Sequence, residues 1–303
     1  MKIFFLISII IIPFFANAQD SIYNKTEIIY GRKDGMALTM VELRPTQHSN
    51  GKAIISLVSG NWVSSYNSLP YYIAGATGYV SRGFTVFLVM HGSQPRYTLP
   101  DEIADVKRAV RFVRYNAGNL GIDPAHIGIT GASSGGHLSL MVATADDEID
   151  LKSRDSVDHV SSRVQAVAVF FPPTDFPHFG FPFFDSSTNK ILPAGSFVAA
   201  AFDFKTFDPV KKIYVPVSDS VRISYIKKLS PIYSVTPDDP PTFIIHGDAD
   251  KVVPIQQSKS MIAKLNEAKV PNKFVIVPGK GHGWADPSAE LKQFADWFEK
   301  YLK

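Results

Sequence analysis

The feature that most constrains the fold is a serine flanked by glycines at 131–135. An apolar run at 127–130 predicts a buried strand, which leads into Gly131-Ala132-Ser133-Ser134-Gly135 and then into a helical pattern. In this G-x-S-x-G pattern the strand turns sharply into a helix and presents its middle residue at the strand tip, and the glycines leave room for close backbone contacts. Ser133 is therefore a candidate nucleophile, although five residues match such a pattern by chance in many chains.

Apolar runs alternate with helical patterns along most of the chain. Buried strands are predicted at 53–58, 84–90, 127–130, 164–171, 243–245 and 274–277, and helices at 69–82, 99–115, 256–268 and the C-terminus. Two earlier strands, 26–30 and 37–43, are joined by Asp34-Gly35, a strong hairpin turn, so the sheet should begin antiparallel. The alternation predicts an α/β fold, a mostly parallel sheet with helices on both faces and a site at the carboxyl ends of its strands.

The first 18 residues predict a signal peptide. Lys2 precedes an apolar run over 3–15, and Ala16-Asn17-Ala18 fits the small-x-small cleavage rule. This run is short for a membrane span, and no later stretch approaches the roughly 20 apolar residues that a span needs. We expect a signal peptide at 1–18, one domain at 19–303, and a secreted or periplasmic protein without a membrane span. A retained N-terminal anchor is the alternative.

Charge and cysteine content narrow the chemistry further. The formal net charge is +3 at pH 7 and no block of like charges appears, so we expect no nucleic-acid surface. The chain has no cysteine, which excludes disulfides and thiolate metal sites. We expect no metal and no organic cofactor.

A serine hydroxyl becomes nucleophilic when a base takes its proton, and His282 is the best candidate for the base of Ser133. It lies in a glycine-rich loop just after the last predicted strand, which brings it to the carboxyl edge of the sheet. His246 ends a strand and is expected to shape the turn that follows. His91, also at a strand end, is expected to line the pocket, and His137, inside the helix after the serine, to be structural.

The base needs an orienting acid, and two aspartates follow the strand before the last one. Asp250 is the preferred candidate and Asp248 the alternative, with Asp175 a distant third. The order Ser133, Asp250, His282 is the order in which this architecture places its nucleophile, acid and base.

The tetrahedral intermediate also requires backbone donors for its oxyanion. One should be the amide of Ser134, at the positive end of the helix that follows the serine. The other should come from the loop after the strand at 53–58, where Asn61 is preferred over Gly60 and the Asn61 side chain is a further possibility. Trp62, in the same loop, is expected to contact substrate.

Residues 176–233 interrupt the alternating pattern, with weak periodicity and scattered prolines. So long an irregular stretch is usually functional, and we expect a cap or a pocket wall. The alternative is that its aromatic residues complete the core. Its phenylalanines are Phe176, Phe179, Phe181, Phe183, Phe184, Phe197, Phe202, Phe204 and Phe207.

These blocks together resemble an α/β-hydrolase of the acetyl esterase/lipase group, close to carbohydrate-esterase and feruloyl-esterase-like members. The resemblance covers nearly all of 19–303 and rests on four blocks: the serine turn with its Gly-Gly-His tail, Leu120–Pro124, His246–Pro254 and Gly281–Trp284. It implies that Ser133, Asp250 and His282 form a catalytic triad. One departure is Val58-Ser59-Gly60-Asn61-Trp62, where such proteins commonly carry His-Gly-Gly-Gly-Trp, so the second oxyanion donor stays open.

The predicted function is a secreted serine esterase that acts on a small-molecule or polysaccharide ester with an acetyl or aromatic acyl group. Catalytic domains of prolyl oligopeptidase-type peptidases share the same blocks, so an exopeptidase is the first alternative. The chain lacks the large N-terminal propeller of those peptidases, however. The second alternative is a non-catalytic binding protein of the same fold, which a complete triad disfavours.

Overall fold

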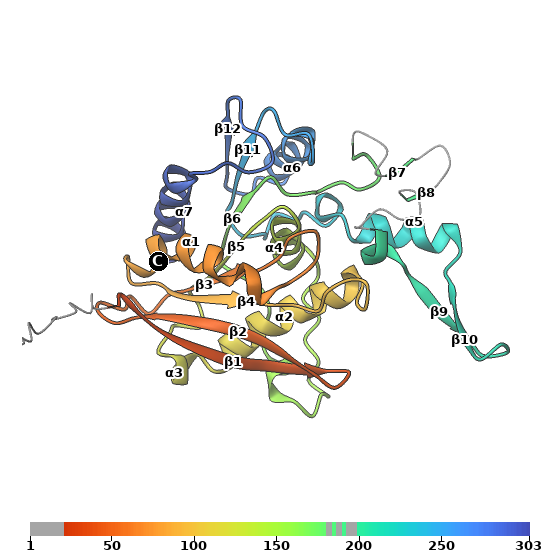
Figure 1. The fold of residues 1–303 in the computed structure, drawn as a ribbon, viewed down its shortest axis with the longest axis horizontal. Helices are drawn as coiled ribbons and strands as arrows, with labels where there is room; N and C mark the ends of the chain where they lie inside the picture. The colour runs from red at the N-terminus through yellow and green to blue at the C-terminus, as the bar shows by residue number, and fades with distance from the viewer. Residues whose placement is uncertain (1–20, 180–183, 186–189, 192–198) are drawn as a thin grey trace, which may run out of the picture.

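An eight-stranded sheet runs through the middle of the molecule in the order β1-β2-β4-β3-β5-β6-β11-β12 (Figure 1). The computed structural model describes residues 21–179, 184–185, 190–191 and 199–303, so the predicted signal peptide lies outside the described residues. The strands of the sheet are β1 (Tyr23–Lys33), β2 (Met36–Pro45), β3 (Ala53–Leu57), β4 (Thr85–Val89), β5 (Ile127–Ala132), β6 (Ala166–Phe170), β11 (Thr242–Gly247) and β12 (Asn272–Val277).

The sheet begins antiparallel and continues parallel, as predicted. β2 is antiparallel to both β1 and β4, whereas the strands from β4 across to β12 are parallel. The turn between β1 and β2 places Asp34 and Gly35 at φ values of 48° and 78°, the left-handed conformation that an Asp-Gly hairpin turn favours. The six parallel strands bring their carboxyl ends to one edge of the sheet.

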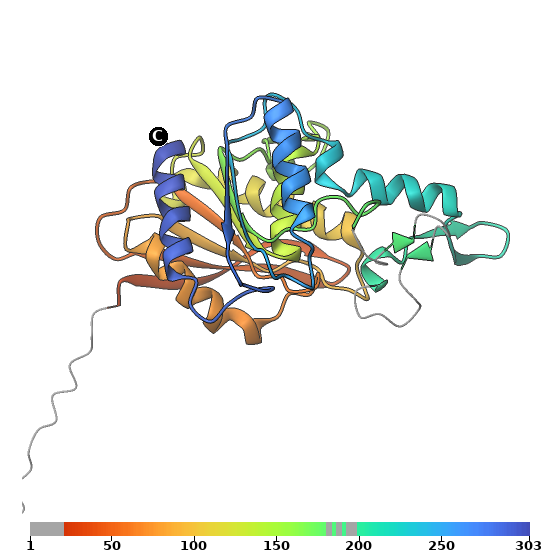
Figure 2. The same ribbon diagram turned by 90° about the horizontal axis from the view of Figure 1, so that it is seen from above.

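Helices cover both faces of the sheet, because successive side chains of each buried strand point in opposite directions. Ile54 of β3 packs in the cluster that contains α1 (Leu69–Val80) and α7 (Ser288–Tyr301), whereas Ile55 packs with residues of α2 (Leu99–Tyr115), α4 (Ser134–Thr144) and α6 (Gln256–Glu267). Figure 2 shows the same layers from above. The predicted α/β-hydrolase architecture is confirmed.

Short elements fill the connections. They are η1 (Tyr66–Ser68), α3 (Ala117–Leu120) and η2 (Ser156–His159). The larger helices keep close to their predicted bounds. β1 and β2 extend further at both ends than the apolar pattern indicates, since several of their outer residues are polar or only half-buried. No helix of the described residues is long and apolar enough to cross a membrane.

The insertion between β6 and β11 projects to one side of the sheet (Figures 1 and 2). Its described elements are β7 (Phe184–Asp185), β8 (Lys190–Ile191), η3 (Ala199–Phe202), β9 (Lys205–Asp208), β10 (Ile213–Pro216), α5 (Asp219–Lys228) and η4 (Pro231–Tyr233). Phe176, Phe179, Phe202 and Phe204 are buried in the main core, while Phe207 is 51% exposed. Part of the insertion therefore completes the core.

The expectation that the insertion forms a pocket wall falls partly on Phe181, Phe183 and Phe197, which lie outside the described residues, as does the side chain of Phe184. The hairpin of β9 and β10 projects away from the sheet (Figure 2).

The two ends of the insertion are joined to each other where it leaves and rejoins the core. The Tyr233 hydroxyl donates to Asp175 Oδ1 at 3.0 Å, and the Phe176 amide donates to Ser230 Oγ at 3.0 Å. The main chain adds a bond from the Ile232 amide to the Thr174 carbonyl. Asp175, the third candidate acid, thus anchors the insertion.

Candidate active site

Ser133 occupies the sharp turn between β5 and α4. Its backbone adopts φ 55° and ψ −121°, a strained conformation for a residue with a side chain. The turn is tight, since a Cβ atom at Gly131 would lie 2.4 Å from the carbonyl carbon of Gly135. The Ser133 amide donates to the Phe170 carbonyl at 3.0 Å, which ties the turn to β6. The strand-turn-helix that the sequence predicts is present, with Ser133 at its tip.

His282 joins Ser133 to Asp250. Its Nε2 atom lies 2.8 Å from Ser133 Oγ, and its Nδ1 atom lies 2.7 Å from Asp250 Oδ2. Because a carboxylate only accepts, Nδ1 carries the proton and Nε2 accepts from the serine hydroxyl. The imidazole packs against the Phe171 ring, with 4.5 Å between centroids. The structure brings the three predicted residues into one hydrogen-bonded chain at the carboxyl edge of the sheet.

The Asp250 carboxylate is buried and multiply bonded. Its Oδ1 atom accepts from the amides of Val252 and Val253, and its Oδ2 atom lies 3.3 Å from His246 Nε2. Burial acts to raise the pKa of Asp250, but the bonds from His246, His282 and the two amides outweigh it and hold the pKa well below its usual range. Asp250 is therefore ionised at neutral pH, and His246 supports its loop.

The other candidates for acid and base have structural partners. Asp248 Oδ1 accepts from the Gly279 amide at 2.6 Å. His137 is fully buried, and its Nε2–H donates to the Leu229 carbonyl at 2.7 Å. Burial lowers the pKa of His137 to about 4, so it stays neutral.

The Ser134 amide lies at the N-terminus of α4, directly after Ser133, as an oxyanion donor requires. The Ser134 hydroxyl lies 3.0 Å from the Ser59 hydroxyl, so the loop after β3 contacts the serine turn. This contact brings the two predicted sources of oxyanion donors together.

The loop after β3 offers few unpaired amides. The Ser59 amide donates to Tyr72 Oη at 3.2 Å, and the Gly60 amide donates to the Val63 carbonyl at 3.0 Å. Gly60 is therefore already paired, contrary to its predicted role. The Asn61 amide has no acceptor within the described part of the chain. Elimination favours Asn61 as the second donor.

The two predicted substrate contacts are buried in supporting positions. Trp62 is 4% exposed, and its Nε1–H donates to His137 Nδ1 at 3.2 Å. His91 Nδ1 lies 2.5 Å from the Gly92 carbonyl, and burial lowers the pKa of His91 to about 4. His91 borders a separate cavity of about 340 Å³, and neither side chain lines the cavity beside Ser133. Chain position alone did not reveal the direction of either side chain.

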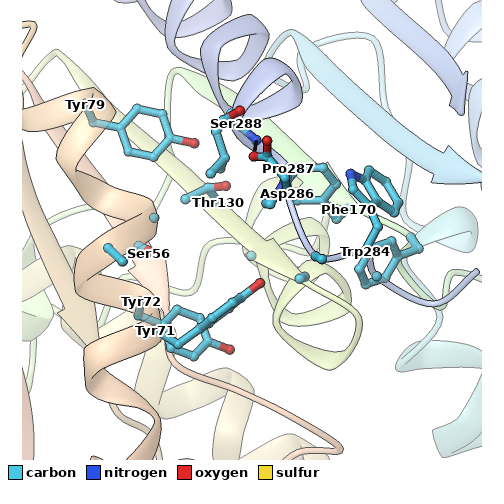
Figure 3. A pocket seen from close by; sticks show the side chains of 18 residues that line it. Ser56, Tyr71, Tyr72, Tyr79, Thr130, Phe170, Trp284, Asp286, Pro287 and Ser288 are labelled. Atoms are coloured by element: carbon cyan, nitrogen blue, oxygen red, sulfur yellow. Dashed lines mark hydrogen bonds between the residues drawn. The ribbon is translucent and has the colours of Figure 1, made fainter. Parts of the chain in front are cut away.

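A cavity of about 400 Å³ lies between α1, β5 and the loop that follows His282 (Figure 3). Gly131 and Ala132, which precede Ser133, line it, as do Gly283 and Trp284, which follow His282. Figure 3 shows Tyr71 and Tyr72 on one side, and Phe170 and Trp284 on the other. Polar side chains of the lining come from Ser56, Tyr79, Thr130, Asp286 and Ser288.

Sequence reasoning did not identify several residues that shape this site. Tyr72 both lines the cavity and bonds Ser59, donating from its hydroxyl to the Ser59 carbonyl at 3.1 Å. Phe171, at φ 34°, carries the ring against His282. Tyr72 and Tyr79 are seven residues apart, so they share one face of α1. The seven-residue spacing could have shown from sequence that the two tyrosines share a helix face, but it does not indicate which residues that face contacts.

Comparisons with known proteins agree with this fold. The chain is 28% identical over 203 residues to "Probable carboxylic ester hydrolase LipM" of Mycobacterium tuberculosis, covering 67% of this chain and 42% of that protein. It is 25% identical over 268 residues to "Esterase LipC" of the same organism, covering 86% of this chain and 60% of that protein. A solved structure described as a truncated form of carbohydrate esterase from gut microbiota matches with a TM-score of 0.72 and 30% identity, covering 93% of this chain and 98% of that one.

The fold is that of the α/β-hydrolase class, and the relatives named above are described as esterases. Within that class, the chain belongs to the BD-FAE family, whose model matches residues 41–265. This chain spans less than two thirds of the length of the two mycobacterial relatives.

Proposed function

We propose that the chain is a serine esterase that forms an acyl-enzyme on Ser133. Ser133 Oγ attacks the ester carbonyl carbon and its proton passes to His282 Nε2, while the amides of Ser134 and Asn61 bind the oxyanion. Collapse breaks the bond between the acyl carbon and the alcohol oxygen, which takes the proton from His282. Water then attacks the acyl carbon, giving a proton to His282, and collapse releases the carboxylic acid and returns that proton to Ser133.

The observation that carries this proposal is the hydrogen-bonded chain from Ser133 through His282 to Asp250, at 2.8 Å and 2.7 Å. The first distance lies within the range that proton transfer to a general base requires, and the second lets Asp250 orient the imidazole of His282. The ionised Asp250 favours the imidazolium that forms when His282 accepts the proton. These features support nucleophilic rather than purely binding chemistry.

The cavity beside Ser133 supports an aromatic acyl group as substrate. Its volume of about 400 Å³ exceeds the needs of an acetyl group, and the rings of Tyr71, Tyr72 and Trp284 give it apolar walls. The Tyr79 hydroxyl is buried, and within the described part of the chain it makes no hydrogen bond of good geometry, although it interacts with the Thr130 side chain. A phenolic or methoxy oxygen on the acyl ring would give that hydroxyl a partner.

Export and a polysaccharide ester belong to the same proposal. The predicted signal peptide at 1–18 favours secretion, and the relative named as a carbohydrate esterase favours a polysaccharide ester. N-terminal sequencing of the exported protein should begin at Gln19. A mature protein that still begins at Met1 would contradict processing.

Replacing Ser133 by alanine tests the mechanism. We expect Ser133→Ala to lose about 10⁴-fold or more in kcat on p-nitrophenyl acetate and to lose labelling by a fluorophosphonate probe. Undiminished hydrolysis by this variant would end the proposal. Faster turnover of an aminoacyl-p-nitroanilide than of the ester would favour the exopeptidase, and an unlabelled, inactive wild-type protein would favour a binding protein.

A substrate panel tests the acyl group. Acetyl-xylan, methyl cinnamate and methyl ferulate differ in acyl size and in the polar groups on the ring. We expect methyl ferulate to give a higher kcat/KM than methyl cinnamate, because its oxygens can pair with the hydroxyl groups of the cavity. Equal values for the two esters would count against that pairing.

A further inference from the structure

The turn that carries Asn61 places a bulky residue, Trp62, in a backbone conformation that it disfavours. Gly60 and Val63 exchange hydrogen bonds of 3.0 Å in both directions, so Asn61 and Trp62 are the two central residues of a tight turn. Their φ values are 53° and 58°, both left-handed. Asparagine tolerates this conformation, whereas it is unfavourable for a bulky residue such as tryptophan. Contacts from outside the turn must stabilise it.

Gln94, in the loop after β4, contacts the carbonyl groups of both central residues. Its Nε2 atom donates to the Asn61 carbonyl at 2.7 Å, and its own backbone amide donates to the Trp62 carbonyl at 3.3 Å. A carbonyl only accepts, so the side-chain atom that faces Asn61 must be the amide nitrogen. Gln94 is 8% exposed, so its own ends of the two bonds are shielded from water.

The Trp62 side chain also anchors the turn, because its Nε1–H donates to His137 and its ring packs against the His137 ring, and two further contacts of the loop lie on its flanks. Tyr72 bonds Ser59 on one flank, and Ser93 Oγ accepts from the Ser64 amide at 2.9 Å on the other. Neither of these two bonds involves the carbonyl group of Asn61 or of Trp62. The conformation of the two central peptides therefore depends on Gln94 more directly than on these flanking bonds.

We propose that Gln94 is a positioning residue, which holds the Asn61–Trp62 turn in the left-handed conformation that presents the Asn61 amide to the oxyanion. This inference rests on the proposed esterase function. Gln94 touches neither substrate nor the reacting atoms, and it acts only through Asn61. Loss of its side-chain bond would let the peptide groups of the turn rotate, and the oxyanion donor would lose its preorganised direction.

The surroundings of Gln94 suit this role. Glu102 is fully buried next to it, and burial together with the Asp105 carboxylate raises the pKa of Glu102 to about 9. Glu102 is thus uncharged at neutral pH and does not compete as a carboxylate for the Gln94 amide. The bond to Asn61 is the one hydrogen bond that the described residues give to the Gln94 side chain.

The test is Gln94→Met, which keeps the side-chain volume and removes the donor. We expect kcat on p-nitrophenyl acetate to fall about 10- to 100-fold, less than removal of an oxyanion donor itself causes, with KM changed less than about threefold. A trifluoromethyl ketone, which forms a tetrahedral adduct on serine, should bind more weakly by the same factor as kcat falls. A role in folding alone would not produce this split between kcat and KM.

The matched control is Gln165→Met, at the opposite edge of the sheet. Gln165 is half-buried, and its Oε1 atom accepts from the Ile127 amide at 3.1 Å. This variant therefore makes the same Gln-to-Met change and also removes one side-chain hydrogen bond. We expect it to lower Tm without changing kcat. If Gln94→Met does not fold, Gln94→Leu carries the same expectation.

Two results overturn the proposal, and they are distinguishable. If Ser133→Ala is inactive but Gln94→Met keeps kcat and ketone affinity within about threefold of wild type, the positioning role alone is wrong. If Ser133→Ala keeps full activity, the esterase mechanism is wrong, and the role of Gln94 falls with it. Equal losses of kcat in Gln94→Met and Gln165→Met would also overturn the positioning role.

Discussion

Close backbone approaches build the Asp250 and His282 side of the site, whereas side-chain hydrogen bonds build the Asn61 side. A Cβ atom at Gly247 would lie 2.2 Å from the Lys280 carbonyl oxygen, but one at Gly60 would meet nothing within 4 Å. The loop of Asn61 is held instead by Tyr72 and Gln94. A close approach requires glycine and so leaves a local motif in the sequence. A hydrogen bond from a side chain on a distant element, such as Gln94, leaves no local sequence motif.

The largest expected effect tests the acid. Asp250→Asn should lower kcat by about 10⁴-fold, because an amide cannot stabilise the imidazolium and can favour the wrong tautomer of His282. Steady-state hydrolysis of p-nitrophenyl acetate measures this loss. Asp248→Asn, whose amide oxygen can still accept from the Gly279 amide, is the control and should stay within about tenfold of wild type. A greater loss in the Asp248 variant would identify Asp248 as the acid.

The next effect tests the close backbone approach. Gly247→Ala should lower the free energy of unfolding by about 3 kcal/mol, because the added methyl group forces the segment at Lys280, next to His282, to move. Urea denaturation measures the change. Gly118→Ala, where a Cβ atom would meet nothing within 4 Å, should stay within about 0.5 kcal/mol of wild type. Equal stabilities of the two variants would mean that this side is not tightly packed.

A smaller effect tests the side-chain support of the oxyanion loop. Tyr72→Phe removes the hydroxyl that accepts from the Ser59 amide and donates to the Ser59 carbonyl. With hydrogen bonds contributing about 1 kcal/mol each, we expect kcat to fall about tenfold. Tyr115→Phe on the exposed face of α2 is the control. Unchanged kcat in the Tyr72 variant would show that the loop keeps its position without this bond.

These differences also explain what could be predicted from sequence. The strand before Ser133, the order of Asp250 and His282 after it, and the alternation that sets the parallel sheet are local patterns with a fixed period or a required glycine. Their placement could therefore be inferred without coordinates. The catalytic roles of the three residues remain predictions for the experiments above.

The supporting residues depend on tertiary contacts that no local pattern encodes. Trp62 was expected to contact substrate, yet the left-handed turn directs its ring into the core against His137. His91 lies at a strand end as predicted, but its side chain is enclosed by the helix that carries Glu102. Gln94 lies 33 positions from Asn61, and only the pairing of β3 with β4 brings their loops together.

The smallest effect concerns the buried carboxyl group behind the oxyanion loop. Burial raises the pKa of Glu102 to about 9, and the Asp105 carboxylate adds to this, while Lys33 opposes it. The folded protein thus keeps a proton that the unfolded chain releases near its ordinary pKa of about 4.3. Between these values the native state binds more protons than the unfolded state, so Glu102 makes the protein less stable as pH rises.

Glu102→Gln is neutral in both states and should remove that contribution. The fall in unfolding free energy between pH 5 and pH 6 should then be smaller than in wild type by about 1 kcal/mol, measured by urea denaturation at both pH values. The exposed Glu267→Gln is the matched control and should leave the fall unchanged. If Glu102→Gln loses as much stability as wild type over this range, Glu102 is ionised in the folded state. Gln94 would then lie beside a buried carboxylate. The Asn61 side of the site would differ from the Asp250 and His282 side in this buried charge as well as in its side-chain hydrogen bonds.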